Sequence, residues 1–167
     1  MKKILSLLFI LIAIQTAVYA DAETDMHQAY IAKIQAQDIK YNTYNFFSAI
    51  SNGNVQLVDL FLKSGMSPDS TFMKTPAIYV AIASNQNEVV KMLLDNKVDP
   101  NKELAGITPL LMAIRQKDAK IVETLIAYGA DVNQSAGYTK PLAYAIQKKQ
   151  PKIVELLINA GAKPDNE

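Results

Sequence analysis

The side chains that could do chemistry are few and scattered. The 167-residue chain has one histidine, His27, and no cysteine. A hydrolase or transferase needs a nucleophile, a base and an orienting group within reach of one another, and a zinc site needs several His or Cys ligands. Nothing next to His27 supplies such partners, and the six glycines form no phosphate-binding loop. We therefore expect no catalytic residue, no metal site and no cofactor, and interpret His27 as a solvated helix residue.

Three carboxylates, Asp59, Glu123 and Glu155, stand at corresponding positions along the chain and could suggest acid–base chemistry. Lys91 occupies the corresponding position in the one remaining stretch. A cation among acids is typical of a solvated helix surface, where such charges contribute little to stability. We interpret these four residues as an exposed row of charges and not as an active site.

A period of 32 residues organises the part of the chain that carries these groups. An Ala-Ile pair appears four times at this interval, as Ala49-Ile50, Ala81-Ile82, Ala113-Ile114 and Ala145-Ile146. A second apolar pair keeps the same register, as Leu57-Val58, Val89-Val90, Ile121-Val122 and Ile153-Val154. Such a period is the signature of a repeat architecture, in which each unit buries its apolar face against its neighbours.

Each unit is predicted to form two short helices and a loop. In the third copy, Thr108 can cap the first helix and Pro109 suits its first position, where no N–H is needed. The small Ala113 allows close approach of a neighbouring helix. The second helix buries a stripe that includes Leu125 and ends at Gly129, which can adopt the left-handed cap conformation.

Two motifs of the third copy resemble those of the ankyrin-repeat family: Gly106-Ile107-Thr108-Pro109-Leu110 and Gly129-Ala130-Asp131-Val132-Asn133. The resemblance covers residues 43–167 and implies an all-α solenoid of four ankyrin repeats. It also implies a non-enzymatic protein–protein interaction module that binds through its concave face and loops.

The chain departs from the family pattern at several positions. Leu111 and Ala143 stand where the family has a histidine, so its hydrogen bonds to the turn must be missing or replaced. Lys140 replaces a capping threonine, and Lys97 replaces the glycine that ends the second helix in the other copies. The second copy also has one extra residue between Pro76 and Ala81.

The N-terminal 20 residues have the pattern of a signal peptide. Lys2 and Lys3 precede an apolar run over residues 4–14, and Val18-Tyr19-Ala20 offers a cleavage site. The run is shorter than the roughly 20 residues of a spanning helix, although an uncleaved anchor is the alternative. Cleavage after Ala20 removes two lysines and changes the net charge from +1 to −1. We expect a periplasmic or secreted protein that binds no nucleic acid and has no membrane span once the signal is cleaved.

Residues 21–42 lie between the predicted signal and the repeats. Met26, Tyr30 and Ile34 are four residues apart and would share one face of a helix. We expect this helix to cap the first repeat, and a flexible tether is the alternative because polar residues follow from Gln35.

The predicted partner is a protein, bound by the loops and by the exposed ends of the first helices. Apolar loop residues are typical of binding surfaces because solubility alone favours polar ones. The candidate contacts are Phe72, Met73, Leu104, Ile107, Arg115, Gln116, Tyr138 and Gln147.

Several alternatives remain at this stage. Small exported bacterial ankyrin-repeat proteins are associated with periplasmic enzymes, so the resemblance also implies an accessory factor of an enzyme such as catalase. A secreted effector is a further alternative. We expect a monomer, although an uncapped solenoid end could also stack on a second copy.

Overall fold

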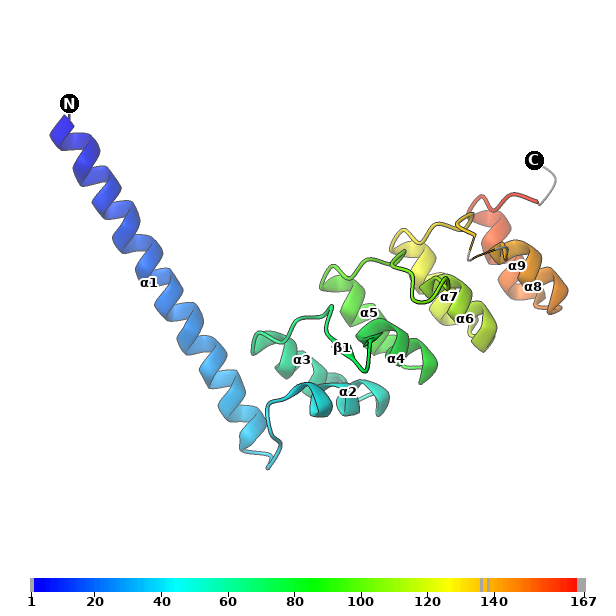
Figure 1. Cartoon of the computed structure of the whole chain (residues 1–167), viewed down its shortest axis with the longest axis horizontal. Helices are drawn as coiled ribbons and strands as arrows, with labels where there is room; N and C mark the ends of the chain where they lie inside the picture. The colour runs from blue at the N-terminus through cyan, green and yellow to red at the C-terminus, as the bar shows by residue number, and fades with distance from the viewer. Residues whose placement is uncertain (1, 136, 138, 165–167) are drawn as a thin grey trace.

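The computed structural model describes residues 2–135, 137 and 139–164, and side chains from residue 15 onward except at residue 17. A long helix, α1 (Lys2–Gln35), precedes a stack of helix pairs (Figure 1). The pairs are α2 (Thr43–Ser51) and α3 (Val55–Lys63), α4 (Ala77–Ala83) and α5 (Asn87–Asp95), α6 (Pro109–Gln116) and α7 (Ala119–Ala127), and α8 (Pro141–Gln147) and α9 (Pro151–Asn159). The predicted all-α solenoid of four repeats is confirmed.

The first helices begin as their sequences predict, with one difference. Thr108 accepts a hydrogen bond from the Leu111 amide at 3.1 Å, and Pro109 is the first residue of α6. In the second repeat the extra residue moves the Thr-Pro pair out of the helix. Thr75 and Pro76 form a short strand there, and α4 begins at Ala77 without a side-chain cap.

The second helices end in the same backbone turn whether or not a glycine is present. Gly129 has a φ of 88°, and the following amide of Ala130 bonds to the Leu125 carbonyl at 2.9 Å. Lys97 builds the same turn with a φ of 68°, a left-handed conformation that costs a residue with a Cβ about 1–2 kcal/mol. The turn at Lys97 therefore has the geometry of the glycine turns, in a backbone conformation that is unusual for a lysine.

The core follows the repeated apolar pairs. Each alanine of the Ala-Ile pairs is buried, and so are the isoleucines of the first three copies. These small residues let successive first helices pack closely, and α4 packs against both α2 and α6. Ile146 is the exception, because it lies on the last repeat and is 57% exposed.

Asparagine side chains also join the repeats. Asn101 donates from Nδ2 to the Gly129 carbonyl at 3.1 Å and accepts from the Asp131 amide at 2.7 Å. Asn133 makes the same pair of bonds to Gly161 and Lys163 of the last repeat. Each asparagine therefore fixes the end of one repeat against the turn of the next.

The segment before the repeats is helical, and only its end acts as a cap. Ile34 is fully buried and α1 packs against α3, while Tyr30 is half-buried and Met26 is 50% exposed. Earlier residues of α1 extend away from the stack (Figure 1). Among the residues that the structure describes, no helix has the length and apolar character to cross a membrane.

Candidate functional site

Short hairpins project from the stack in front of the first helices. Strand β1 (Thr71–Phe72) pairs antiparallel with β2 (Thr75–Pro76), with Phe72 opposite Thr75. The two tip residues, Met73 and Lys74, both have positive φ values of 49° and 67°. This geometry is that of a two-residue hairpin turn in which Asn or Gly is usual, so an exposed methionine there is not required by the turn.

A second hairpin repeats this geometry in the next copy. Leu104 and Ile107 form an antiparallel bridge, and each donates its amide to the other's carbonyl at 3.0 Å. Ala105 and Gly106 form its tip with φ values of 50° and 73°. The bridge turns Leu104 and Ile107 toward the first helices, where both are half-buried.

Two hollows lie between these hairpins and the first helices. The first has a volume of about 260 Å³, the second about 280 Å³, and Val80 lines both. Because they share this residue, we treat them together as the loop–helix groove. Its lining residues are Tyr44, Phe47, Ser48, Ser51, Phe72, Thr75, Tyr79, Val80, Ala83, Leu104, Ala105, Ile107 and Met112.

Aromatic rings form the wall of the first hollow. Phe72 lies with its ring centroid 5.7 Å from that of Phe47 and 6.0 Å from that of Tyr44. Tyr44 is 65% exposed, whereas Phe72 is half-buried against the core. Phe72 is therefore both part of the packing and part of the surface.

Tyr79 fixes the hairpin that walls the second hollow. Its hydroxyl lies 2.9 Å from the Lys102 carbonyl oxygen and also reaches the Ile107 carbonyl. The Leu104 amide donates to the hydroxyl oxygen at 3.1 Å. Burial raises the pKa of Tyr79 to about 12, so this side chain is a neutral hydrogen-bonding group at physiological pH.

The predicted contact residues fall into three groups. Phe72, Leu104 and Ile107 line the loop–helix groove, and Met73 is 84% exposed at the adjacent hairpin tip. Arg115 and Gln116 are exposed at the end of α6, and Gln147 lines a separate hollow of about 430 Å³ on α8. Tyr138 lies outside the described residues.

Sequence reasoning missed part of the groove as a binding surface. Tyr44 is not among the predicted contacts, although it is 65% exposed. Val80 and Met112 belong to the first helices and are half-buried, and Ala83 ends α4 with its side chain exposed. A usable signal was their spacing from the Ala-Ile pairs, which places them on the helix face opposite the core.

The groups considered for chemistry lie apart from this groove. Lys63 Nζ donates a hydrogen bond to Asp59 Oδ2 at 2.7 Å, one helical turn away. Lys91 Nζ lies 3.6 Å from Asp95 Oδ2 in the same arrangement. The row of charges is exposed as interpreted, because Lys91, Glu123 and Glu155 are exposed and the Asp59 side chain is 40% exposed. Within the described residues, no group of three His, Cys, Asp or Glu side chains is placed to hold a metal ion.

The stacked helix pairs, projecting hairpins and apolar groove define a helical repeat protein. Comparison with protein families matches the chain to the family described as Ankyrin repeats (3 copies), over residues 14–104 and 98–167. The chain belongs to the ankyrin-repeat family. Ankyrin repeats are generally protein–protein interaction modules, and the family and fold are non-enzymatic.

A solved structure supports the same fold. The chain is similar to the ankyrin repeat domain of Bcl-3, a unique member of the IkappaB protein family, with a TM-score of 0.62 and 23% identity. The similarity covers 71% of this chain and 55% of that one, so the chain spans about half the length of that domain. At this identity the likeness concerns the fold alone. Comparison with curated protein sequences gives no match.

Proposed function

We propose that this protein is an exported, non-enzymatic binding protein that holds a protein partner in the loop–helix groove. The observation that carries the proposal is the pair of hollows, both lined by Val80, between the hairpins and the first helices. Apolar side chains held at the surface are typical of interaction sites because solubility disfavours them elsewhere. Ankyrin repeats are generally interaction modules, which supports the same function.

The shape of the groove favours a partner segment with two apolar anchors. The first hollow lies against α2 and α4, and the second against α4 and α6, so the anchors would be about one repeat apart. Exposed charged residues are near lining residues in the sequence: Lys74 precedes Thr75, Glu103 precedes Leu104, and Arg115 follows Met112 by three helical positions. A buried apolar centre with a polar rim is the usual organisation of a protein interface.

The N-terminal sequence supports export to the periplasm or the medium. The partner would then be another exported protein, and an accessory role for a periplasmic enzyme is the form of this function that the family resemblance implies. Mass measurement on protein from the cell envelope should find a chain that begins at Asp21. An intact Met1 start on membrane-bound material would contradict export with cleavage.

Affinity capture from the envelope fraction tests the binding function with a matched pair of variants. Ala83 ends α4 and lines the groove, while Ala127 ends α7 on a second helix, and both are exposed. Ala83→Glu places a charge in the groove, so we expect it to reduce the captured partner at least about tenfold, equivalent to about 1.4 kcal/mol.

Ala127→Glu makes the same chemical change at the same position of a helix, outside the groove, and we expect it to retain the partner. Both variants should keep the circular dichroism and melting temperature of the parent. Equal capture by the two variants would place the binding surface elsewhere.

A further inference from the structure

The last repeat exposes the face that, in each earlier repeat, packs against the repeat that follows it. Ile146 is 57% exposed, whereas its three counterparts are fully buried: Ile50, Ile82 and Ile114. Val154 is half-buried, and its counterparts are also fully buried: Val58, Val90 and Val122. This face of α8 and α9 thus has the apolar composition of an interface, continuous with those between the repeats, and no described residue covers it.

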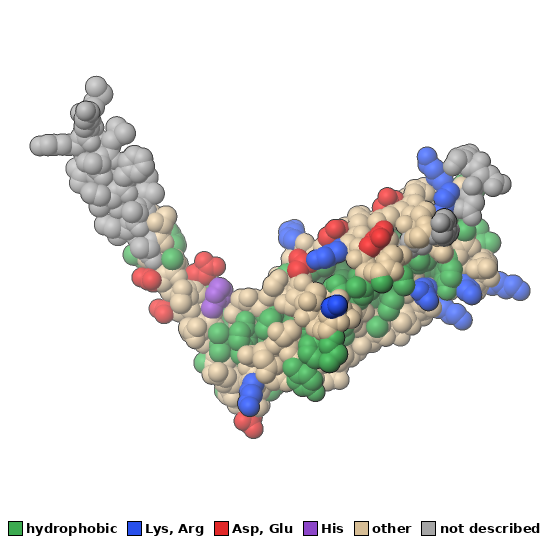
Figure 2. All heavy atoms as spheres, viewed as in Figure 1, with side chains coloured by type: hydrophobic (Ala, Val, Ile, Leu, Met, Phe, Trp, Pro, Cys, Tyr) green, Lys and Arg blue, Asp and Glu red, His purple; other side chains and the backbone are tan. Residues whose placement is uncertain are grey.

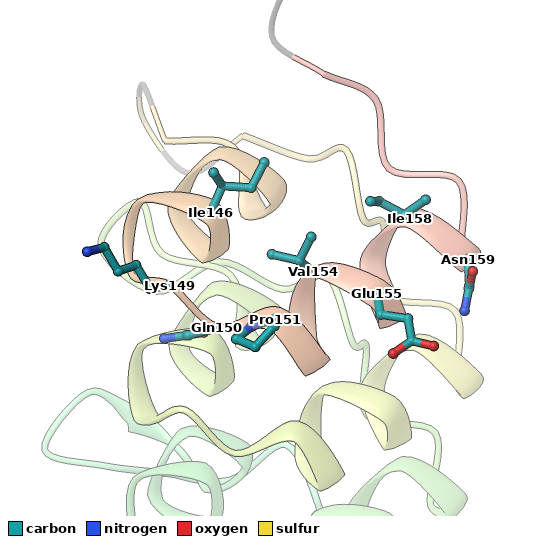
Figure 3. Close-up of a pocket in the computed structure, with 8 residues that line it drawn as sticks. All are labelled: Ile146, Lys149, Gln150, Pro151, Val154, Glu155, Ile158 and Asn159. Atoms are coloured by element: carbon teal, nitrogen blue, oxygen red, sulfur yellow. The ribbon is translucent and has the colours of Figure 1, made fainter.

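The exposed face forms a hollow of about 740 Å³, which we call the end groove. Figure 3 shows Val154 between Ile146 and Ile158, with Lys149 on one side and Glu155 on the other. Ile158 is 55% exposed. The end groove therefore offers a strip of three aliphatic side chains, open to solvent, to a helix or a helix pair.

Lysines give the surroundings of the end groove a positive charge. Lys148, Lys149 and Lys152 are all exposed, and in the described part of the chain none of them forms an ion pair. Glu155 supplies the opposing charge. Two copies meeting by their end grooves would bring these lysines together, so charge favours an acidic occupant over a symmetric dimer.

The chain itself carries an acidic helix of suitable character. Asp21, Glu23 and Asp25 are exposed on α1, and in the described structure none of them pairs with a cation. Figure 2 shows acidic side chains on this part of α1 and basic side chains around the last repeat. Ala22, Met26 and Ala29, also exposed, follow at intervals of four and three residues and so share one helix face.

We propose that residues 21–29 of α1 in one copy bind the end groove of a second copy. Ile34 holds the end of α1 against its own first repeat, while residues 21–29 keep exposed acids and a weakly apolar face available. The two surfaces lie at different ends of the molecule, so each copy can bind one neighbour at each end (Figure 1). Such a contact joins copies head to tail and leads to open chains of molecules.

This inference does not rest on the proposed binding function, because the contact uses neither the hairpins nor the loop–helix groove. Assembly would place several loop–helix grooves along one chain of molecules. This proposal differs from the sequence-based expectation of a monomer.

Disulfide cross-linking of the full chain tests the contact directly, because the chain has no cysteine of its own. The double variant Met26→Cys/Ile146→Cys is expressed in cells, and the cells are treated with an oxidant. The repeats separate the two positions within one molecule (Figure 1), so a bond between them joins two copies. We expect a ladder of dimers and larger species on a non-reducing gel that disappears on reduction.

Two further variants define the specificity of the cross-link. Met26→Cys/Lys91→Cys moves the second cysteine to an exposed site on α5, and we expect no ladder. Adding Lys149→Glu and Lys152→Glu to the first variant should reduce the cross-linked fraction at least tenfold, and adding Glu23→Lys and Asp25→Lys to that should restore it. All changes are at exposed positions, and unchanged circular dichroism verifies folding.

A monomer alone from the first variant would overturn the proposal. An equal ladder from the Lys91→Cys control would overturn it too, because the cross-links would then reflect random collisions. If the cysteine at position 146 forms cross-links only to a different protein and none to a second copy of this chain, the end groove binds another partner and the proposal is wrong.

Discussion

The hydroxyl of Tyr79 lies 2.9 Å from the carbonyl oxygen of Lys102, across the boundary between the second and third repeats. The hydroxyl oxygen of Tyr79 accepts a hydrogen bond from the Leu104 amide at 3.1 Å. One buried side chain thereby fixes the hairpin that walls half of the loop–helix groove. The stability of the stack and the shape of the groove thus depend on the same contact.

Removing this hydroxyl should destabilise the protein. Tyr79→Phe removes one of the two acceptors of the half-buried Leu104 amide and the donor to the Lys102 and Ile107 carbonyls. We therefore expect the free energy of unfolding to fall by about 0.5–1.5 kcal/mol. Urea unfolding followed by circular dichroism measures the change. Tyr44→Phe is the control, because that ring is largely exposed and the change should stay within about 0.5 kcal/mol. Equal effects of the two substitutions would contradict the role of Tyr79.

The raised pKa of Tyr79 predicts a loss of stability at high pH. The ordinary value is 10.0, and burial raises the pKa in the folded protein to about 12. Between these values the unfolded chain releases the tyrosine proton while the folded protein keeps it, so rising pH favours unfolding.

From this side chain, the free energy of unfolding should fall by at most about 1.4 kcal/mol per pH unit between pH 10 and 12. Tyr79→Phe should decline less steeply over the same interval. Parallel curves for parent and variant would show that this tyrosine ionises equally in both states.

Tyr79 forms hydrogen bonds that the sequence analysis did not predict. Tyr79 precedes Ala81 by two residues, as Leu111 precedes Ala113 and Ala143 precedes Ala145. The prediction that the histidine's hydrogen bonds are missing or replaced concerns Leu111 and Ala143 of the third and fourth repeats. In the second repeat the Tyr79 hydroxyl bonds to the Lys102 carbonyl and the Leu104 amide. The acceptors of this hydroxyl lie 23 and 28 residues away, in a hairpin whose conformation no local pattern specifies.

The turns that end the second helices predict opposite effects of two substitutions. Lys97→Gly removes the conformational cost of a side chain at a left-handed backbone position, so we expect it to stabilise the protein by about 0.5–1 kcal/mol. Gly129→Ala should destabilise it by about 1 kcal/mol. A Cβ at Gly129 would meet no other atom within 4 Å, so its cost would come from the backbone alone. Thermal unfolding decides, and a loss of stability in Lys97→Gly would contradict the assigned strain.

Overpacking at the repeat boundary should also be costly. Ala113 is fully buried, so Ala113→Leu must displace neighbouring side chains at a cost of about 1–3 kcal/mol. Ala127→Leu adds the same atoms at an exposed helical position and should change the free energy of unfolding by less than about 0.5 kcal/mol. Chemical unfolding measures the free energy of unfolding of both variants. An unchanged free energy in Ala113→Leu would contradict the packing of α6 between α4 and α8.

The binding surface was less predictable than the scaffold. Fixed spacing of apolar residues determines which side chains enter the core, and therefore the Ala-Ile pairs and the Thr108 cap were predicted correctly. Whether Phe72 projects into solvent depends on the rings of Tyr44 and Phe47, which a single loop sequence does not specify. Ile146 has the pattern of a core residue and is exposed because it faces away from the preceding repeat.

Hydrogen–deuterium exchange on the complex with a captured partner tests the use of the loop–helix groove most directly. We predict slower exchange of backbone amides in residues 71–76 and 104–107 and in α4, with no change in the exposed turns of α5 and α7. The Ala83→Glu variant should lose this protection, and Ala127→Glu should keep it. Protection confined to the second helices or to residues 21–42, with exchange unchanged around the groove, would contradict the account.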